Sequence, residues 1–398
     1  MKPLLKTTIF AATTALLAAP AWAQGDFRDC LQTIKSDAMR QGVSAAIADR
    51  AFQGLTPDQK IVDLDSKQPE FSLTYAKYVG SAVSNDRIVK GQQRLAQHRA
   101  LLDALQSEYG VPPQYIMAFW GVETNYGGFM GDFQVVRSVA TLACMTKRRD
   151  FFSNETVQAL RILAMNHMTR EQMRGSWAGA MGNMQFMPST FMKWGVDRTG
   201  DGRIDLWNSL PDAFASAANF LRGIGWKPPL PAAEEVFLPQ GFPFDQADTT
   251  VEKPVRAWAQ MGVKRAGNAA LPGSDEPSSI ILPAGHRGPA FLLYPNFKAV
   301  MNWNRSTLYA LSVAILAQQI AGGPPVMQAA PADDEPLSRD TVIDMQNRLA
   351  RLTLYTDEID GLLGPKTRSA VRLYQKQIGM PADGHPTPAF VRRLQQAR

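Results

Sequence analysis

A single glutamate interrupts an apolar stretch of the sequence. Residues 114–128 read QYIMAFWGVETNYGG, so Glu123 follows the apolar residues of a helix that we expect to be buried. An unpaired carboxylate in such surroundings is costly, and burial raises the pKa of a carboxyl group. A carboxylic acid that keeps its proton near neutral pH can protonate a leaving oxygen, so Glu123 is a candidate general acid. The alternative is a buried salt bridge with one of three basic residues, Lys147, Arg148 or Arg149.

Amides and hydroxyls lie in similar glycine-rich or aromatic surroundings. They are Asn125, Tyr126, Ser176, Gln185, Asn304 and Tyr309. Small residues that let a ligand approach the backbone, together with polar groups and aromatic rings, suit a sugar polymer. The pattern predicts a glycan-binding cleft. Each of these residues also has an ordinary interpretation, because satisfied amides and aromatic rings are common in protein cores.

Other kinds of chemistry lack their motifs. The sequence has no HExxH motif, phosphate-binding loop or Rossmann fingerprint, and its four histidines are scattered. The stretch GSWAG at 175–179 places its serine directly after the first glycine, unlike the G-x-S-x-G elbow of a serine hydrolase. The net charge of +6 comes without a basic run that carries interleaved aromatic residues. We therefore expect no zinc centre, no nucleophilic triad and no nucleic-acid partner.

Helical segments must position the candidate acid. Apolar residues recur at three- and four-residue spacing between about 26 and 110, and helical texture returns at 304–323, where Ser306 can cap a helix. Between 227 and 295, the short runs EVFLP, SSIILPA and AFLLYP are separated by turn residues and predict a small β-rich insertion. The predicted fold is mainly α, with the chemistry in the glycine-rich segment 111–225.

The N-terminal residues predict export. Residues 1–23 combine two lysines, an apolar stretch and the small-x-small triplet Ala21-Trp22-Ala23, which is the pattern of a signal peptide. We therefore expect a periplasmic protein. Cys30 lies past the cleavage point, so no lipid anchor is expected, and no later apolar run is long enough for a membrane span. Cys30 and Cys144 could pair in an oxidising compartment; two buried free thiols are the alternative.

The stretch VDRTGDGRIDLWNSLPD at 196–212 resembles a calcium-binding loop. Asp197, Thr199 and Asp201 stand at positions one, three and five of an EF-hand-like loop, with Gly202 at the sharp turn. Position twelve is Asn208 instead of the usual glutamate. Two interpretations are open, a structural calcium ion or a tight turn held by aspartate hydrogen bonds. Either would brace the fold, and we expect no cofactor to be required for catalysis.

Several of these motifs together resemble one family. GVETNYGG, GSWAGAMGNMQFMPSTF, the GDG stretch before DLWNS, and YPNF followed by NRSTLYALSV are similar to the soluble membrane-bound-type B lytic murein transglycosylases of glycoside hydrolase family 103. The resemblance covers about 27–321. It implies a lysozyme-like α-helical core, a helical subdomain, a small β-rich subdomain and peptidoglycan as substrate.

The resemblance also implies roles for individual residues. Glu123 falls on the catalytic acid/base, and four residues fall on nearby glycan subsites, namely Ser176, Gln185, Asn304 and Tyr309. Arg148 and Arg149 fall on a basic pair near the stem peptides, and Asp212 falls on the aspartate that closes a longer calcium loop. Trp303 stands where a tyrosine is usual, a departure from the family pattern.

The C-terminal residues resemble a second family, the small helical peptidoglycan-binding domain 1. A turn and a helix occur twice there, with Asp360-Gly361 echoed by Asp383-Gly384. The first turn has the family's IDG-x-x-G-x-x-T pattern, whereas the second, DGHPTP, lacks the usual glycine. A dimerisation or packing module is the alternative.

These patterns predict a periplasmic lytic transglycosylase that cleaves the β-1,4 bond between N-acetylmuramic acid and N-acetylglucosamine and leaves 1,6-anhydro ends. The expected domains are the catalytic domain 24–321, an extended linker 322–336 and a binding domain 337–398. The expected partners are peptidoglycan glycan strands and their stem peptides, with cell-wall synthesis complexes as further candidates. A hydrolytic muramidase and an inactive wall-binding scaffold are the alternative functions.

Overall fold

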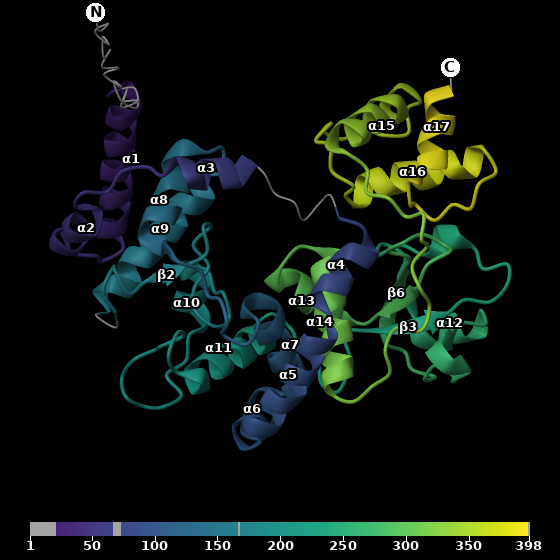
Figure 1. The fold of residues 1–398 in the computed structure, drawn as a ribbon, viewed down its shortest axis with the longest axis horizontal. Coiled ribbons are helices and arrows are strands. Elements are labelled where there is room, and N and C mark those ends of the chain that lie inside the picture. The colour runs from purple at the N-terminus through teal and green to yellow at the C-terminus, as the bar shows by residue number, and fades with distance from the viewer. Residues whose placement is uncertain (1–20, 67–72, 166–167, 397–398) are drawn as a thin grey trace, which may run out of the picture.

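The computed structural model describes residues 21–66, 73–165 and 168–396 (Figure 1). Residues 1–20, which hold most of the predicted signal peptide, lie outside this range. Within the described range, no helix has both the length and the apolar character that crossing a bilayer requires.

Helices precede and surround the segment in which we expect the chemistry. The first group is α1 (Ala21–Arg40), α2 (Ala45–Phe52), α3 (Gln59–Ser66), α4 (Tyr75–Ala82), α5 (Asn85–Gln97), α6 (Arg99–Tyr109) and α7 (Pro113–Thr124). The second group is α8 (Val135–Met145), α9 (Arg149–Ala164), α10 (Pro188–Trp194), α11 (Leu210–Gly223), α13 (Pro295–Trp303) and α14 (Thr307–Ile320). The helical patterns read from the sequence are confirmed, including the cap, since the Ser306 hydroxyl accepts the amide hydrogen of Tyr309.

Helix α7 is the central element of the main core. It starts with Pro113 at its first turn, where the missing N–H costs nothing, and it is apolar on nearly all sides. It packs against α14, α5 and α6, which lie around it in Figure 1. Its end is set by Asn125, whose φ of 51° and ψ of 50° place it in the left-handed conformation that terminates helices. Glu123 therefore lies at the point where the buried helix stops.

The β-rich insertion is a five-stranded antiparallel sheet with strand order β4-β6-β7-β3-β5. Its strands are β3 (Ala233–Phe237), β4 (Lys253–Pro254), β5 (Lys264–Arg265), β6 (Pro277–Ile281) and β7 (Ala290–Leu293), with the short helices α12 (Val255–Gln260), η2 (Phe244–Gln246) and η3 (Ala266–Asn268) between them. The three predicted β-prone runs overlap β3, β6 and β7, and the β-rich insertion has its own small core around Trp258. A separate two-residue ribbon joins β1 (Phe133–Gln134) to β2 (Arg174–Gly175).

The C-terminal module is built from the predicted repeat. Its helices are α15 (Arg339–Arg351), α16 (Pro365–Gln377) and α17 (Pro388–Gln396), around a core of their own. Two glutamines hold the two turns in the same way. The amide of Gln346 donates to Asp360 Oδ1 at 2.8 Å and accepts from the Gly361 N–H at 2.8 Å. Gln375 does the same with Asp383 and Gly384, each also at 2.8 Å.

The segment between the two domains is held along the catalytic domain. The backbone amides of Met327 and Gln328 donate to the carboxylate of Glu235 on β3, at 2.8 and 2.9 Å. Glu235 is buried, and the Gln328 side chain donates to the Arg287 carbonyl at 3.2 Å. The sequence predicted an extended linker from its proline and acidic content. The composition of the linker did not predict this contact, in which the carboxylate of Glu235 binds the linker backbone.

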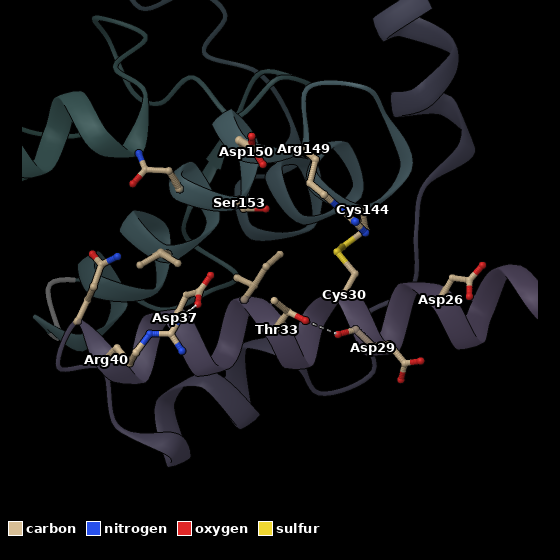
Figure 2. Close-up of a pocket in the computed structure, with 14 residues that line it drawn as sticks. Asp26, Asp29, Cys30, Thr33, Asp37, Arg40, Cys144, Arg149, Asp150 and Ser153 are labelled. Carbon is tan, nitrogen blue, oxygen red and sulfur yellow. Dashed lines mark hydrogen bonds and ion pairs between the residues drawn. A yellow bond between two sulfur atoms is a disulfide. The ribbon is translucent and has the colours of Figure 1, made fainter.

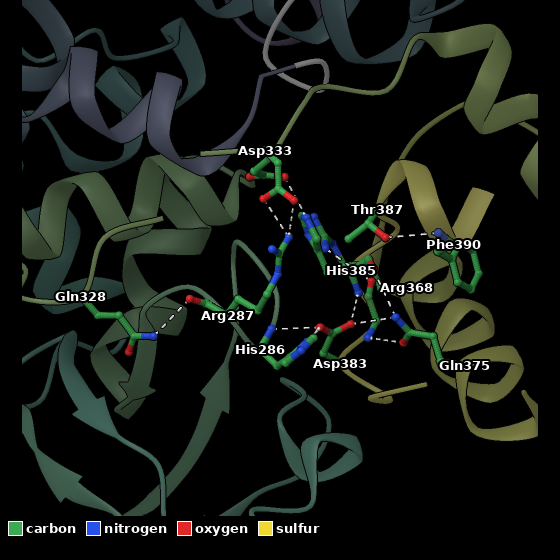
Figure 3. Close-up of polar contacts among 12 residues, drawn as sticks. His286, Arg287, Gln328, Asp333, Arg368, Gln375, Asp383, His385, Thr387 and Phe390 are labelled. Atoms are coloured by element: carbon green, nitrogen blue, oxygen red, sulfur yellow. Dashed lines mark hydrogen bonds and ion pairs between the residues drawn. The ribbon is translucent and has the colours of Figure 1, made fainter. Parts of the chain in front are cut away.

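The module docks on the β-rich insertion through hydrogen bonds and an ion pair (Figures 1 and 3). Asp383 Oδ2 accepts the backbone amide hydrogen of His286 at 2.9 Å and lies 2.6 Å from His286 Nδ1. Arg372 on α16 forms a largely buried ion pair with Asp248. In addition, His385 Nε2 lies 2.9 Å from Oδ1 of the linker residue Asp334. Side chains of the insertion, the linker and the module thus meet in one polar network.

A disulfide joins Cys30 on α1 to Cys144 on α8, across 114 residues of sequence. Figure 2 shows this bond at the edge of a cavity of about 830 Å³ that lies between α1 and α9. The bond ties the first described helix to the core of the catalytic domain.

Candidate active site

Two neutral donors converge on one oxygen of Glu123. The hydroxyl of Tyr309 donates a hydrogen bond to Oε1, and Nε1 of Trp303 donates to the same atom at 2.9 Å. Glu123 is half-buried. The salt-bridge alternative named a cation as the partner of Glu123, whereas these two partners are a phenol and an indole.

The spacing of α7 explains how these groups meet. Phe119 precedes Glu123 by one helical turn, so the two side chains lie on the same face. The Trp303 ring stacks on Phe119 with centroids 4.2 Å apart and planes inclined by 30°. Because Trp303 ends α13 and Tyr309 lies in the first turn of α14, the break between these helices brings both side chains to Glu123.

Tyr309 is fully enclosed by the core. Burial, followed by the charge of Glu123 and the hydrogen bond to it, raises the pKa of Tyr309 far above its ordinary value. The phenol therefore keeps its proton at any physiological pH and acts on Glu123 as a hydrogen-bond donor.

The two residues after α7 differ in exposure: the first side chain is exposed and the second is buried. Asn125 is exposed at the helix end. Tyr126 is buried, its ring meets Trp120 edge-to-face at 5.5 Å, and its hydroxyl donates to the Arg87 carbonyl at 2.7 Å. The sequence grouped Tyr126 with the sugar-contacting residues. In the structure it braces the turn from inside, because an αL residue after the helix directs its ring into the core.

Gln185 and Ser176 lie on the glycine-rich loops that adjoin the end of α7. Gln185 Nε2 donates to the carbonyls of Met130 and Gly182, at 3.1 and 2.9 Å, and so links two loops. Ser176 Oγ accepts the Ala180 amide hydrogen at 3.0 Å. The loops approach closely because Gly131 has a φ of +90° and a Cβ there would lie 2.2 Å from the Gly175 carbonyl oxygen. Both polar side chains are half-buried.

Asn304 follows Trp303 directly. Its Oδ1 accepts the backbone amide hydrogen of Ser306 at 3.1 Å, so it shapes the turn between α13 and α14. It is half-buried, which leaves part of the side chain accessible. The turn that Asn304 holds is the same turn that delivers Trp303 and Tyr309 to Glu123.

The arginine pair is engaged elsewhere. Arg148 forms an ion pair with Asp65 on α3, and its guanidinium lies 4.8 Å from the centroid of the Phe152 ring. Arg149 and Asp150 line the cavity between α1 and α9 (Figure 2). Glu123 does not line this cavity. The predicted contact of the two arginines with stem peptides therefore stays a prediction, and no ion pair between either arginine and Glu123 appears among the described contacts.

The GDG loop is held by its aspartates. Asp212 is buried and accepts the amide hydrogens of Arg198, Thr199 and Asp205, at 2.9, 3.2 and 3.1 Å. Asp197 accepts those of Gly200 and Gly202, at 2.7 and 2.8 Å. Among the residues that the structure describes, no group of three or more acidic, histidine or cysteine side chains is gathered as metal ligands. As arranged here, these carboxylates hold the turn through backbone amides.

Asn183 is a buried residue of the site that sequence reasoning missed. Its Oδ1 accepts the indole hydrogen of Trp120 at 2.9 Å, and its carbonyl accepts the hydroxyl hydrogen of Thr124 at 2.9 Å. Its amide nitrogen donates to the carbonyls of Leu206 and Trp207. Asn183 therefore joins the end of α7 to the segment after the GDG loop. The available signal was a polar residue inside the glycine-rich stretch GAMGNMQF, two positions before Gln185.

Comparison with known proteins places this arrangement in a family. The model of the transglycosylase SLT domain matches residues 26–318. The chain belongs to this family. The model of a putative peptidoglycan binding domain matches residues 338–394 of this transglycosylase.

Individual relatives agree with this assignment. Membrane-bound lytic murein transglycosylase B of Escherichia coli (strain K12) is 30% identical over 254 residues, which are 62% of this chain and 67% of that protein. SltB3 from Pseudomonas aeruginosa, in complex with NAG-NAM-pentapeptide, is 43% identical with a TM-score of 0.89, over 92% of this chain and 99% of that one. The Escherichia coli lytic transglycosylase Slt35 in complex with calcium is 26% identical with a TM-score of 0.61, over 75% and 93%.

These comparisons confirm two predictions about this transglycosylase. The fold class is mainly α, with a lysozyme-like catalytic core, a small β-rich subdomain and C-terminal helices. The enzyme class is that of the lytic transglycosylases, and the chain carries a peptidoglycan-binding domain.

Proposed function

We propose that Glu123 is the single acid/base of a lytic cleavage of peptidoglycan, at the β-1,4 bond between N-acetylmuramic acid and N-acetylglucosamine. One observation carries the assignment of this residue. Glu123 ends a buried helix, and a phenol and an indole bind one of its oxygens. Neutral donors orient a carboxyl group without the strong bias toward the ionised form that an adjacent cation imposes.

The proposed reaction needs one carboxyl group in two successive roles. Glu123 gives its proton to the glycosidic oxygen as the bond from that oxygen to C1 of the muramic acid breaks. The N-acetyl carbonyl of the same sugar stabilises C1. Glu123, now a carboxylate, takes the proton of the C6 hydroxyl, and O6 bonds to C1 to close the 1,6-anhydro ring. Glu123 ends the cycle protonated and no water is consumed, so a second carboxylate to position water is not needed.

Three half-buried polar residues are proposed to hold the sugar beside Glu123. Gln185 and Ser176 lie on the glycine-rich loops, and Asn304 lies in the turn that carries Trp303. Amides and hydroxyls on such loops can bind sugar hydroxyls and the N-acetyl group. Because these residues act on the substrate and transfer no proton, their loss should slow turnover less than loss of Glu123 does.

The C-terminal module is proposed to hold the enzyme on the wall. Its docking on the β-rich insertion fixes its position relative to the catalytic domain, which raises the local substrate concentration at Glu123. The same proposal includes a periplasmic location after removal of residues 1–23, contacts with stem peptides and association with cell-wall synthesis complexes. A structural calcium ion in the GDG loop is the alternative to a turn held by backbone amides alone.

Digestion of purified sacculi tests the assignment of Glu123. The wild-type protein should release soluble muropeptides, and Glu123→Gln should release almost none, because an amide is too weak an acid to protonate the leaving oxygen. Glu171→Gln is the matched control, since Glu171 is exposed and pairs with its neighbour Arg170. A Glu123→Gln variant as active as the control would overturn the assignment.

A further inference from the structure

Trp303, the last residue of α13, contacts the side chain of Glu123. Its indole N–H points at Oε1 of the proposed catalytic acid at 2.9 Å, and the Tyr309 hydroxyl donates to that same atom. Both donors approach from the core side, where Trp303 and Tyr309 each pack on Phe119.

The two donors, the Tyr309 phenol and the Trp303 indole, differ in the hydrogen bonds that they can form. A phenol can donate or accept, whereas an indole N–H can only donate. The phenol oxygen alone of these two groups could accept a proton placed on Oε1, since the indole cannot accept one, and Tyr309 would then no longer donate to Oε1. A proton on Oε2 conflicts with neither of them. The donor-only character of Trp303 therefore distinguishes the two oxygens of one carboxyl group.

We propose that Trp303 is a positioning residue that keeps the proton of Glu123 on Oε2, both when the acid gives it to the leaving oxygen and when the base recovers it from the C6 hydroxyl. This inference rests on the proposed role of Glu123. With the proton on Oε2, the same oxygen atom reacts in both steps, so the side chain of Glu123 need not rotate between them. Oε1 keeps its two hydrogen bonds throughout the cycle and stabilises the carboxylate that forms between the steps.

The surroundings of Trp303 suit this role. Its ring stacks on Phe119, meets Phe186 edge-to-face at 5.4 Å and lies 5.0 Å from the Phe220 ring. Aromatic contacts on several sides fix the direction of the N–H bond. The next residue, Asn304, holds the backbone turn through its bond to the Ser306 amide. A donor whose direction is fixed in this way needs little reorganisation during the reaction.

Kinetics separate positioning from packing. Trp303→Phe keeps an aromatic ring on Phe119 but removes the N–H, so kcat should fall about tenfold while KM changes less than about twofold. Trp258→Phe is the matched control, because it removes an indole hydrogen bond to the Ser278 carbonyl in the separate core of the β-rich insertion. The control should lower the melting temperature and leave kcat unchanged. An unchanged kcat in Trp303→Phe would overturn the proposal.

A spectrum tests the contact without any turnover, and it applies even where Trp303→Phe folds poorly. In the ¹H–¹⁵N spectrum of the full chain, Glu123→Ala should move the Trp303 indole proton upfield, since it loses its acceptor, and leave the Trp258 signal in place. Identical Trp303 signals in both proteins would overturn the proposal. If wild type made no anhydro products but the signal moved, the proposed reaction would fail while the contact stood.

Discussion

The hydroxyl of Tyr309 donates a hydrogen bond to Oε1 of Glu123, although 186 residues separate them in the sequence. The contact exists because α14 packs along α7 and because Ser306 starts α14 one turn before the tyrosine. Between the two residues the chain forms the glycine-rich loops and the whole β-rich insertion. The segments before and after the β-rich insertion are therefore both required to build the environment of the Glu123 carboxyl group.

Loss of the Tyr309 hydroxyl should slow catalysis without unfolding the protein. Tyr309→Phe keeps the buried ring, and kcat should fall by about tenfold to a hundredfold because one donor to Glu123 is lost. The raised pKa of Tyr309 means that its proton stays in place below pH 10, so wild-type activity should show no alkaline loss caused by this phenol. Steady-state kinetics and a melting curve check both points. Wild-type kcat in Tyr309→Phe would contradict the account.

Reduction of the disulfide should cost stability and spare activity. The bond between Cys30 and Cys144 closes a loop of 114 residues, and chain entropy gives an upper value of about 4–5 kcal/mol for such a loop. The sulfurs border the cavity between α1 and α9, which Glu123 does not line. The reduced and alkylated protein should therefore melt at a lower temperature and keep its kcat at 25 °C. Two free thiols in the unreduced, denatured protein would refute the bond.

The two interpretations of the GDG loop, a bound calcium ion and a turn held by hydrogen bonds to aspartates, predict different results. If backbone amides hold Asp212 as in the structure, Asp212→Ala should lower the melting temperature by several degrees, because three amides lose a buried acceptor. A chelator should then have little effect on the wild type. Stabilisation by millimolar calcium in the wild type that is absent from Asp197→Ala would instead establish the ion site.

Docking of the module should depend on Asp383. Asp383→Asn weakens the bonds to His286, so small-angle scattering should show a larger radius of gyration than for the wild type. Asp360→Asn is the matched control, because it alters the equivalent glutamine-held turn in the first repeat of the same module. Equal radii for the two variants would contradict a docking role for Asp383.

The contact between Asp383 and His286 has a predictable pH dependence. Burial raises the pKa of Asp383, but the hydrogen bonds from His286, His385 and Gln375 outweigh it, so the pKa lies below its ordinary value. A lowered pKa adds stability that is fully present above the unfolded value of about 3.9 and is lost as the pH falls through the folded value. Docking through Asp383 should thus persist at neutral pH and weaken only below about pH 4. Scattering curves recorded across this range would check it, and loosening near neutrality would contradict the assignment.

The sequence predicted well what depends on local pattern. Apolar spacing located the helices, Ser306 marked a helix start, and the repeated Asp-Gly pairs marked the two turns of the module. What it missed depends on long-range contact. The direction of Tyr126 is set by a left-handed backbone, and the role of Trp303 is set by the ring of Phe119 on another helix. The contact of Glu235 on β3 with the linker amides is likewise a long-range contact that composition alone does not predict.

The fate of water during cleavage tests the central claim most directly. Sacculi are digested by the full chain in H₂¹⁸O, and the products are analysed by mass spectrometry. The masses show whether O6 of the sugar or a water molecule attacks C1. The account predicts muropeptides that end in 1,6-anhydro sugars, are one water lighter than hydrolysis products and carry no ¹⁸O at C1. Reducing ends that carry one ¹⁸O each would contradict it and identify the enzyme as a hydrolytic muramidase.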